Sequence, residues 1–259
     1  DGEASTQAGE DGDEPAAVPL DFTWRLNALQ LDLGSLIDRL HDRRVWVGVA
    51  PREETLASPC LLCGDNGQGK SLVAKTLAGA LAYTGEARVE GPRGARRVRL
   101  LFQDVFNQSL MRSMPQLAPR GEDDGVAAAY DAIRDVIRHR APLAGRTLSA
   151  FGERRHDAAP LSLLEMKILL TALRLADHDG VLILDEPDWG LSRPDAVAFV
   201  AAVVRAAHDR GVPVILISHK PWWRNLARSV RRVSKQTVSS GADGCLFRIR
   251  IDADPGGPS

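Results

Sequence analysis

The feature that most constrains the fold of this chain is the stretch Gly64-Asp-Asn-Gly-Gln-Gly-Lys-Ser71, which fits the pattern GxxxxGK[ST]. A short apolar run, Pro59 to Cys63, precedes it, and a stretch with a helical pattern, Ser71 to Leu81, follows it. Glycines allow successive backbone N–H groups to turn inward around an anion, and the following helix presents its N-terminus to the same anion. The sequence therefore predicts a strand, a loop and a helix that together bind phosphate.

Several residues of this loop are candidates for binding a nucleotide. In loops of this pattern the lysine, here Lys70, reaches the β- and γ-phosphates, and the hydroxyl of Ser71 can ligate Mg²⁺. The alternative is an ordinary glycine-rich loop. The candidate binding residues are Gly64, Asn66, Gly67, Gly69, Lys70 and Ser71.

A second feature, Val181-Leu-Ile-Leu-Asp-Glu-Pro187, places two carboxylates after a fully apolar run. In a phosphate-loop enzyme the acid at the end of such a strand, here Asp185, holds Mg²⁺. The next acid, Glu186, would orient or deprotonate the attacking water. The alternative is a pair of surface acids in a turn, but the apolar run delivers both to a strand end, where ligands bind in open α/β sheets.

Short apolar runs alternate with helical patterns along the chain. The runs Val181–Leu184 and Pro213–Ile217 are typical of central strands in a parallel sheet, and a helix from about Pro194 to Asp209 separates them. Val98–Phe102 has the pattern of another strand, and the alternating Leu246–Ile251 indicates an edge or outer strand. This order predicts an α/β fold: a P-loop NTPase core with a mostly parallel central sheet flanked by helices.

The sequence also predicts how the chain is divided. Residues 1–19 are rich in acids, Gly, Ala and Pro and are expected to form a disordered acidic tail, and residues 20–259 one folded domain. Residues from about 107 to 176 interrupt the strand pattern with helices at about Gly125–Arg140 and Ser162–Ala176. This stretch is expected to form an inserted α-helical subdomain.

Charge and cysteine usage exclude several classes of function. The net charge of −1 over 259 residues gives no field that would attract nucleic acid, so no specific nucleic-acid partner is expected. No apolar run approaches the roughly 18 residues of a membrane span, and no secretion signal opens the chain. Cys60 and Cys63 form a CxxC, but within a strand they point to opposite faces, and no partner ligands complete a metal site.

Together these motifs resemble the nucleotide-binding subunit of the ATP-binding cassette (ABC) superfamily, over residues 45 to 220. Phe102-Gln103-Asp104 matches the Q-loop and Ile217-Ser-His219 the H-switch. The resemblance implies that ATP and Mg²⁺ are the cofactors, that Gln103 contacts Mg²⁺ and the attacking water, and that His219 contacts the γ-phosphate. Family members also stack adenine on an upstream aromatic residue. Here His41 and Trp46 lie in the right region, and Trp46 is equally well read as a core residue.

Two motifs depart from the family. The signature LSGGQ reads Leu161-Ser-Leu-Leu-Glu165, in which Ser162 is retained, and the D-loop reads Trp189-Gly-Leu-Ser192. Both act across a dimer, on the partner's nucleotide. The signature stretch is also a capping box, and Glu165 would place a negative charge where the partner's phosphate belongs. The helix is therefore expected to keep its structure but to bind phosphate poorly.

The resemblance implies an ATP-hydrolysing subunit of an ABC transporter that drives a separate membrane permease subunit by ATP-dependent dimer closure. Such a subunit is cytoplasmic and peripherally associated with the cell membrane. The degenerate motifs imply either a homodimer with slow ATPase activity or a heterodimer with a second, more regular ABC subunit. The alternative is a soluble ABC-type ATPase without a transport role, and the DEP and SH elements argue against a phosphate-loop kinase.

Overall fold

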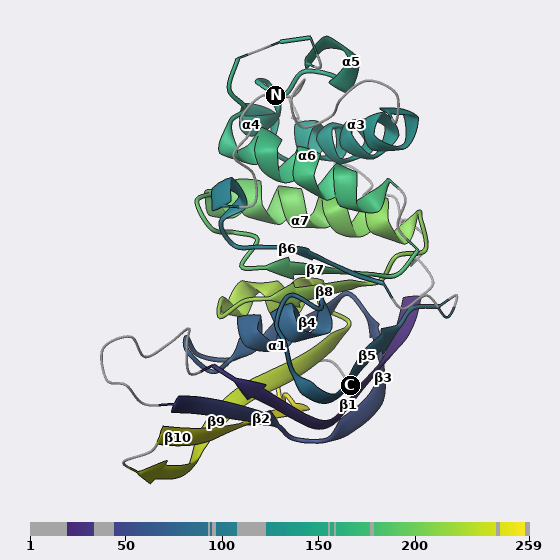
Figure 1. Cartoon of the computed structure of the whole chain (residues 1–259). Helices are drawn as coiled ribbons and strands as arrows, with labels where there is room; N and C mark the ends of the chain where they lie inside the picture. Colours follow the sequence, from purple (N-terminus) through teal and green to yellow (C-terminus); the bar gives the residue numbers. More distant parts are fainter. Residues whose placement is uncertain are drawn as a thin grey trace, which may run out of the picture.

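The computed structural model describes residues 20–33, 44–92, 94, 97–107, 123–154, 156–157, 159–176, 179–241 and 244–256, so the predicted tail at 1–19 lies outside it. The strands form one sheet in the order β3-β1-β2-β10-β9-β4-β8-β7-β6, and β5 pairs with β1. Figure 1 shows a β-rich layer at the bottom, parallel strands in the middle and a layer of helices at the top.

The middle of the sheet consists of short parallel strands. Parallel pairing joins β4 to β8, β8 to β7 and β7 to β6, and β9 lies parallel to β4 on its other side. The predicted apolar runs are thus central strands, buried because other elements cover both faces. This confirms an α/β fold with a mostly parallel central sheet. The bounds are β4 Cys60–Cys63, β6 Val98–Leu101, β7 Val181–Asp185, β8 Val214–Ile217 and β9 Ser229–Gly241.

Side chains of the central strands alternate between two hydrophobic cores. In β7, Leu182 and Leu184 pack into the core beneath the helical layer, whereas Ile183 packs into the core on the opposite face. The same alternation puts Cys63 in the first core and Cys60 in the second, as predicted for residues three apart in a strand. Burial raises the pKa of the Cys60 thiol to about 12. The CxxC therefore contributes to packing on both sides of the sheet.

The predicted long helices are present, with small differences at their ends. α1 ends at Leu77, earlier than the predicted Leu81, because Gly79 adopts the left-handed conformation (φ 68°) that ends many helices. α1 lies on the face of the second core, and α3, α6 and α7 lie on the other. The bounds are α1 Lys70–Leu77, α3 Asp123–Arg140, α6 Leu163–Leu175 and α7 Arg193–His208.

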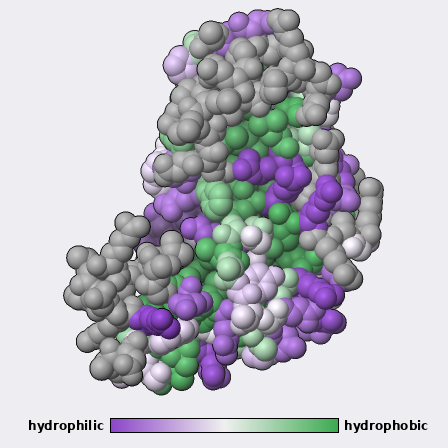
Figure 2. All heavy atoms as spheres, viewed as in Figure 1, coloured by the Kyte–Doolittle hydropathy of each residue, from purple (hydrophilic) through white to green (hydrophobic). Residues whose placement is uncertain are grey.

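Between β6 and β7 the described residues contain helices and no strand. These are η1 Val105–Asn107, α3, α4 Pro142–Gly145, α5 Phe151–Arg154 and α6. α3 packs against both α6 and α7, so the predicted insertion shares a core with the rest of the domain. Its independence as a subdomain stays a prediction. Within the described ranges, no helix is long and apolar enough to cross a membrane. On the face of the molecule seen in Figure 1, Figure 2 shows apolar residues in the middle, flanked by polar ones.

The β-rich layer was not foreseen, and it corrects one prediction. β1 pairs antiparallel with β2, β3 and β5. β10, predicted as an edge or outer strand from Leu246–Ile251, lies inside the sheet, parallel to β2 and antiparallel to β9. Its alternation arises because Ile249 and Ile251 face the core while Arg248 and Arg250 face solvent. The bounds are β1 Leu20–Asp32, β2 Arg44–Val49, β3 Arg52–Ser58, β5 Thr84–Glu90 and β10 Gly244–Ala253.

Candidate functional site

The predicted phosphate loop connects β4 to α1 and rests against β9 and β10. Gly64 takes φ 144°, and a Cβ there would lie 2.4 Å from the carbonyl oxygen of Val233 in β9. Gly69 takes φ 95°, and a Cβ there would lie 2.4 Å from Cδ1 of Ile249 in β10. Only glycine satisfies both the backbone angle and the close approach. The glycines therefore fix the loop in place against the sheet.

The side chain of Lys70 lies inside this loop. Its Nζ donates hydrogen bonds to the carbonyl oxygens of Gly64 (2.8 Å) and Asp65 (2.9 Å), and only 5% of the residue is exposed. Carbonyl groups of the phosphate loop thus hold the Lys70 ammonium in place. A phosphate bound there would meet a fixed cation together with the N-terminus of α1.

Ser71 and Asp185 form a pair of oxygen donors. The hydroxyl of Ser71, in the first turn of α1, donates to Oδ1 of Asp185, at the end of β7, over 3.0 Å. Asp185 is 4% exposed. Burial and the charge of Glu186 raise the pKa of this carboxyl, although the hydrogen bond from Ser71 opposes the rise. A hydroxyl and a carboxylate at this spacing fit a Mg²⁺ ion, which prefers oxygen ligands and would relieve the cost of a buried charge.

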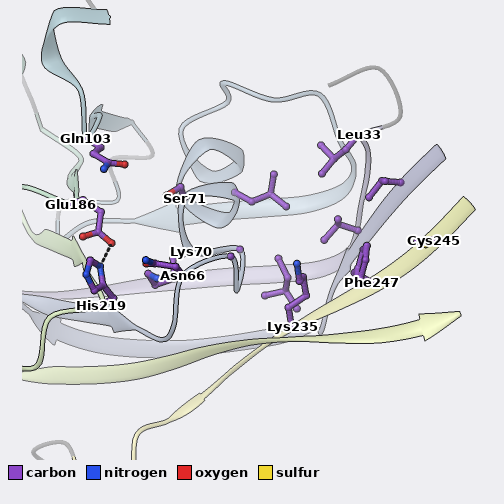
Figure 3. A pocket seen from close by; sticks show the side chains of 16 residues that line it. Leu33, Asn66, Lys70, Ser71, Gln103, Glu186, His219, Lys235, Cys245 and Phe247 are labelled. Carbon is purple, nitrogen blue, oxygen red and sulfur yellow. Dashed lines mark hydrogen bonds and ion pairs between the residues drawn. The ribbon is translucent and has the colours of Figure 1, made fainter. Parts of the chain in front are cut away.

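Glu186 lies between β7 and β8 in an unusual backbone conformation. Its φ is 45°, a left-handed angle that is uncommon for residues other than glycine and that clusters at functional sites. One carboxylate oxygen is 3.1 Å from Nδ1 of His219, and the other accepts a hydrogen bond from Ser218 (3.3 Å). The turn thus aims Glu186 at the end of the neighbouring strand, where His219 follows β8 (Figure 3).

The order of the strands explains why these side chains meet. Gln103 follows β6, Asp185 ends β7, His219 follows β8, and the phosphate loop follows β4. These four strands are parallel neighbours, so their carboxyl ends lie at one edge of the sheet. Gln103, Glu186 and His219 line the same cavity as the loop residues Asn66, Gly67, Gly69, Lys70 and Ser71.

This cavity has a volume of about 700 Å³ and two different ends. Figure 3 shows Gln103, Glu186 and His219 at one end, and Leu33 and Phe247 at the other. Lys70 and Ser71 lie between them. The sequence did not point to the second end, which is lined by Leu33, Val45, Val47, Lys235, Cys245, Phe247 and Ile249.

The remaining candidates lie outside the cavity. Trp46 is absent from its lining although Val45 and Val47 belong to it, because alternate residues of β2 face opposite sides. The second aromatic candidate, His41, lies outside the described residues. Ser162 does not line the cavity either; it is the N-cap of α6.

The structure confirms the capping box in the signature stretch. Ser162 Oγ accepts from the backbone N–H of Glu165 (3.3 Å), and Glu165 Oε2 accepts from the backbone N–H of Ser162 (2.8 Å). The negative charge predicted at Glu165 has a partner within the chain, because Nε of Arg154 lies 3.0 Å from Glu165 Oε1. Both residues are 7% exposed. The polar groups of Ser162 and Glu165 at the start of α6 are thus already paired within this chain, by the capping hydrogen bonds and by the ion pair with Arg154. Poor phosphate binding at this position stays a prediction.

The two divergent motifs contact each other. A Cβ built on Gly190 would lie 2.5 Å from Cδ2 of Leu163, and Gly190 takes φ 75°. Ser192, which stands where the family has an acid, caps α7 by accepting from the N–H of Asp195 (3.3 Å). Trp189 is 41% exposed. The replaced residues therefore have local structural roles within this chain.

The known proteins that this chain resembles include several import ATP-binding proteins. The chain is 28% identical over 209 residues to a probable anion import ATP-binding protein of Haloferax volcanii, covering 73% of this chain and 70% of that protein. It is 31% identical over 173 residues to a ribose import ATP-binding protein of Rhizobium etli, covering 61% of this chain and 32% of that protein. A zinc import ATP-binding protein of Paracoccus denitrificans is 30% identical over 163 residues, with coverage of 60% and 56%. The match thus spans between 32% and 70% of these relatives' lengths.

Solved structures agree on the fold. An RNase-L inhibitor is similar over 94% of this chain and 42% of that chain, with a TM-score of 0.55 and 16% identity. An ATP-binding cassette of an ABC transporter in its ADP conformation is similar over 83% of this chain and 87% of that chain, with a TM-score of 0.53 and 14% identity. No protein-family model matches the chain.

Proposed function

We propose that this chain, which belongs to the ATP-binding cassette (ABC) superfamily, binds and hydrolyses ATP with Mg²⁺ as a subunit of an ABC transporter. The observation that carries the proposal is the meeting of Gln103, Asp185, Glu186 and His219 with the phosphate loop at one edge of the sheet. Names of the curated relatives, which are import ATP-binding proteins, support the transport role.

In this proposal the phosphate loop provides binding energy and position. Lys70 would turn its ammonium from the carbonyl oxygens of Gly64 and Asp65 to the β- and γ-phosphates of ATP. Ser71 and Asp185 would hold Mg²⁺, which supplies positive charge beside the phosphates when bound. Gln103 lines the same cavity and would contact Mg²⁺ and the attacking water.

Glu186 would act as the general base. Its side chain is 12% exposed and fixed by His219 and Ser218, so it holds one position at the cavity wall. A carboxylate held in this way can accept a proton from water if the water lies within hydrogen-bond reach. His219 would keep Glu186 oriented and contact the terminal phosphate from the same side.

Dimer closure and a membrane partner are further parts of the proposal. The pairing of polar groups at the start of α6 argues that this chain contributes weakly to a partner's nucleotide site, so its ATPase activity alone would be low. The partner would be either a second copy or a more regular ABC subunit, and the helical insertion between β6 and β7 would contact the permease.

We expect Lys70→Ala to lower the affinity for Mg-ATP at least tenfold, because hydrogen bonds to charged groups contribute about 1.5–3 kcal/mol each. Isothermal titration calorimetry of the purified protein measures this directly. Lys75→Ala is the matched control, since Lys75 lies on the same helix but does not line the cavity, and it should leave the affinity unchanged. Equal affinities for Lys70→Ala and the wild type would contradict nucleotide binding by this loop.

We expect the protein to fractionate with membranes after cell lysis, and to be released by mild detergent together with an integral membrane protein. Affinity purification followed by mass spectrometry of the released complex identifies that partner. Recovery as a soluble complex with nucleic acid, in the absence of any membrane protein, would reject the transport role and favour a soluble ABC-type ATPase.

A further inference from the structure

The apolar end of the cavity has a chemistry of its own. We propose that this end holds the base of the nucleotide and that Phe247, on β10, is the aromatic platform on which the base stacks. The inference rests on the proposed function, because it assumes that the phosphate loop binds a nucleotide. Beyond the proposed function, the inference names the residue that holds the base, and this residue lies on β10.

The direction of the cavity supports this assignment. Figure 3 shows Lys70 and Ser71 between the polar end, with Glu186 and His219, and the end with Phe247. A nucleoside triphosphate with its terminal phosphate near Glu186 must extend its base away from that residue. Past the phosphate loop, the described lining residues lie on β2, β9 and β10 and just after the end of β1.

The walls at this end suit a flat aromatic ring. Phe247 is partly buried, and mostly aliphatic side chains line the cavity around it. It is the one phenylalanine, tyrosine or tryptophan among the described residues lining the cavity. Stacking on an aromatic side chain is a common way to hold a base whatever its hydrogen-bonding edge. The surrounding side chains are Leu33, Val45, Val47, Cys245 and Ile249.

A cation lies over the ring of Phe247. Nζ of Lys235 lies 4.8 Å from the centroid of the Phe247 ring, a cation–π distance. The backbone N–H of Lys235 donates to Oε1 of Gln68 in the phosphate loop over 2.6 Å. This bond ties β9 to the loop, so the platform and the phosphate site keep a fixed separation. The exposed ammonium of Lys235 is free to move to the phosphates when a base covers the ring.

The position of Trp46 argues against it as the platform. A Cβ built on Gly244 would lie 2.7 Å from Cζ3 of the Trp46 ring, so this ring packs on Gly244. Gly244 and Cys245 are consecutive in β10 and face opposite sides, and Cys245 is the one that lines the cavity. Trp46 therefore lies on the face of the sheet that points away from the base.

Binding of Mg-ATP and of inorganic tripolyphosphate, measured by calorimetry, tests the proposal. In Phe247→Leu the affinity for ATP should fall about tenfold, because the aliphatic side chain keeps the bulk but loses the ring. The affinity for tripolyphosphate, which has no base, should stay within twofold of wild type. Phe247→Tyr keeps the ring and should retain the ATP affinity within threefold. Trp46→Leu, the matched aromatic control, should bind ATP as the wild type does.

Several outcomes would overturn the proposal. Unchanged ATP affinity in Phe247→Leu would do so, as would a loss of ATP affinity in Trp46→Leu alone. An equal loss for ATP and tripolyphosphate in Phe247→Leu would show damage to the phosphate loop and reject a base platform. If the wild type binds neither ligand, the proposed function fails and this inference with it. If both bind and Phe247→Leu has no effect, only this inference fails.

A measurement on the wild-type protein tests the proposal even if a variant does not fold. Photolabelling with 8-azido-ATP attaches the base to residues close to it. The label should appear on the peptides that carry Lys235 and Phe247, and excess unlabelled ATP should remove it. Labelling confined to peptides that do not line the apolar end of the cavity would reject the assignment.

Discussion

Glu186→Gln should bind Mg-ATP with wild-type affinity but hydrolyse it about 10²–10⁴ times more slowly, the usual contribution of a general base. The amide has the same shape and can keep one hydrogen bond to Ser218 or His219, so the site should stay assembled. It cannot accept a proton from water. Single-turnover hydrolysis with enzyme in excess measures the chemical step even if the chain is slow alone, and calorimetry gives the affinity.

Two further variants make this result interpretable. Glu153→Gln changes an exposed carboxylate on α5 and should leave turnover unchanged. His219→Ala removes the residue that lies 3.1 Å from Glu186, and should slow turnover less than Glu186→Gln if the histidine mainly positions the carboxylate. Wild-type turnover in Glu186→Gln would reject Glu186 as the base. A loss of affinity equal to the loss of rate would assign it to binding instead.

The edge of the sheet that carries the candidate catalytic residues could be predicted from sequence because its signals are local. The strands β4, β7 and β8 are short apolar runs, and the phosphate loop, Glu186 and His219 follow them within two residues; Gln103 follows β6 in the same way. Parallel strands bring their carboxyl ends to one edge whatever their order. The meeting of Gln103, Asp185, Glu186 and His219 therefore needed no knowledge of which strand pairs with which.

The apolar end of the cavity could not be predicted because its signals are distant from each other. Val45 and Phe247 line one pocket only because β2 and β10 pair in parallel, in a register that places Val47 opposite Phe247. The alternation in Leu246–Ile251 indicated a strand with two unlike faces. It could not show that the strand lies inside the sheet, because pairing on both sides depends on β2 and β9, which were not identified.

Glu165 shows what a sequence interpretation of charge leaves out. In isolation, an acid at the start of α6 predicts repulsion of phosphate. Its partner, Arg154, ends the short helix α5, and the guanidinium faces the carboxylate. Nη2 of Arg154 also donates to the carbonyl oxygens of Ala159 and Pro160. The pair neutralises the charge and also holds the segment that leads into the signature stretch.

We expect Glu165→Gln to lower the free energy of unfolding by about 3 kcal/mol, because removal of one partner leaves a buried charge uncompensated. Asp157 lies 2.5 Å from Nη1 of Arg154 and keeps part of the compensation, which places the loss at the lower end of the usual range. Glutamine still serves in a capping box, so the variant removes the charge and keeps the cap. Urea unfolding followed by circular dichroism measures the loss.

A double-mutant cycle with Arg154→Met separates the ion pair from general packing. Each single variant leaves one buried charge, whereas Arg154→Met together with Glu165→Gln leaves none, so the double variant should recover most of the loss. Losses that simply add would contradict coupling between Arg154 and Glu165.

ATPase activity provides a second readout. Since the charge of Glu165 is already neutralised, Glu165→Gln alone should not raise turnover. A clear rise would mean that the carboxylate does repel phosphate, and that the ion pair gives way when two subunits meet.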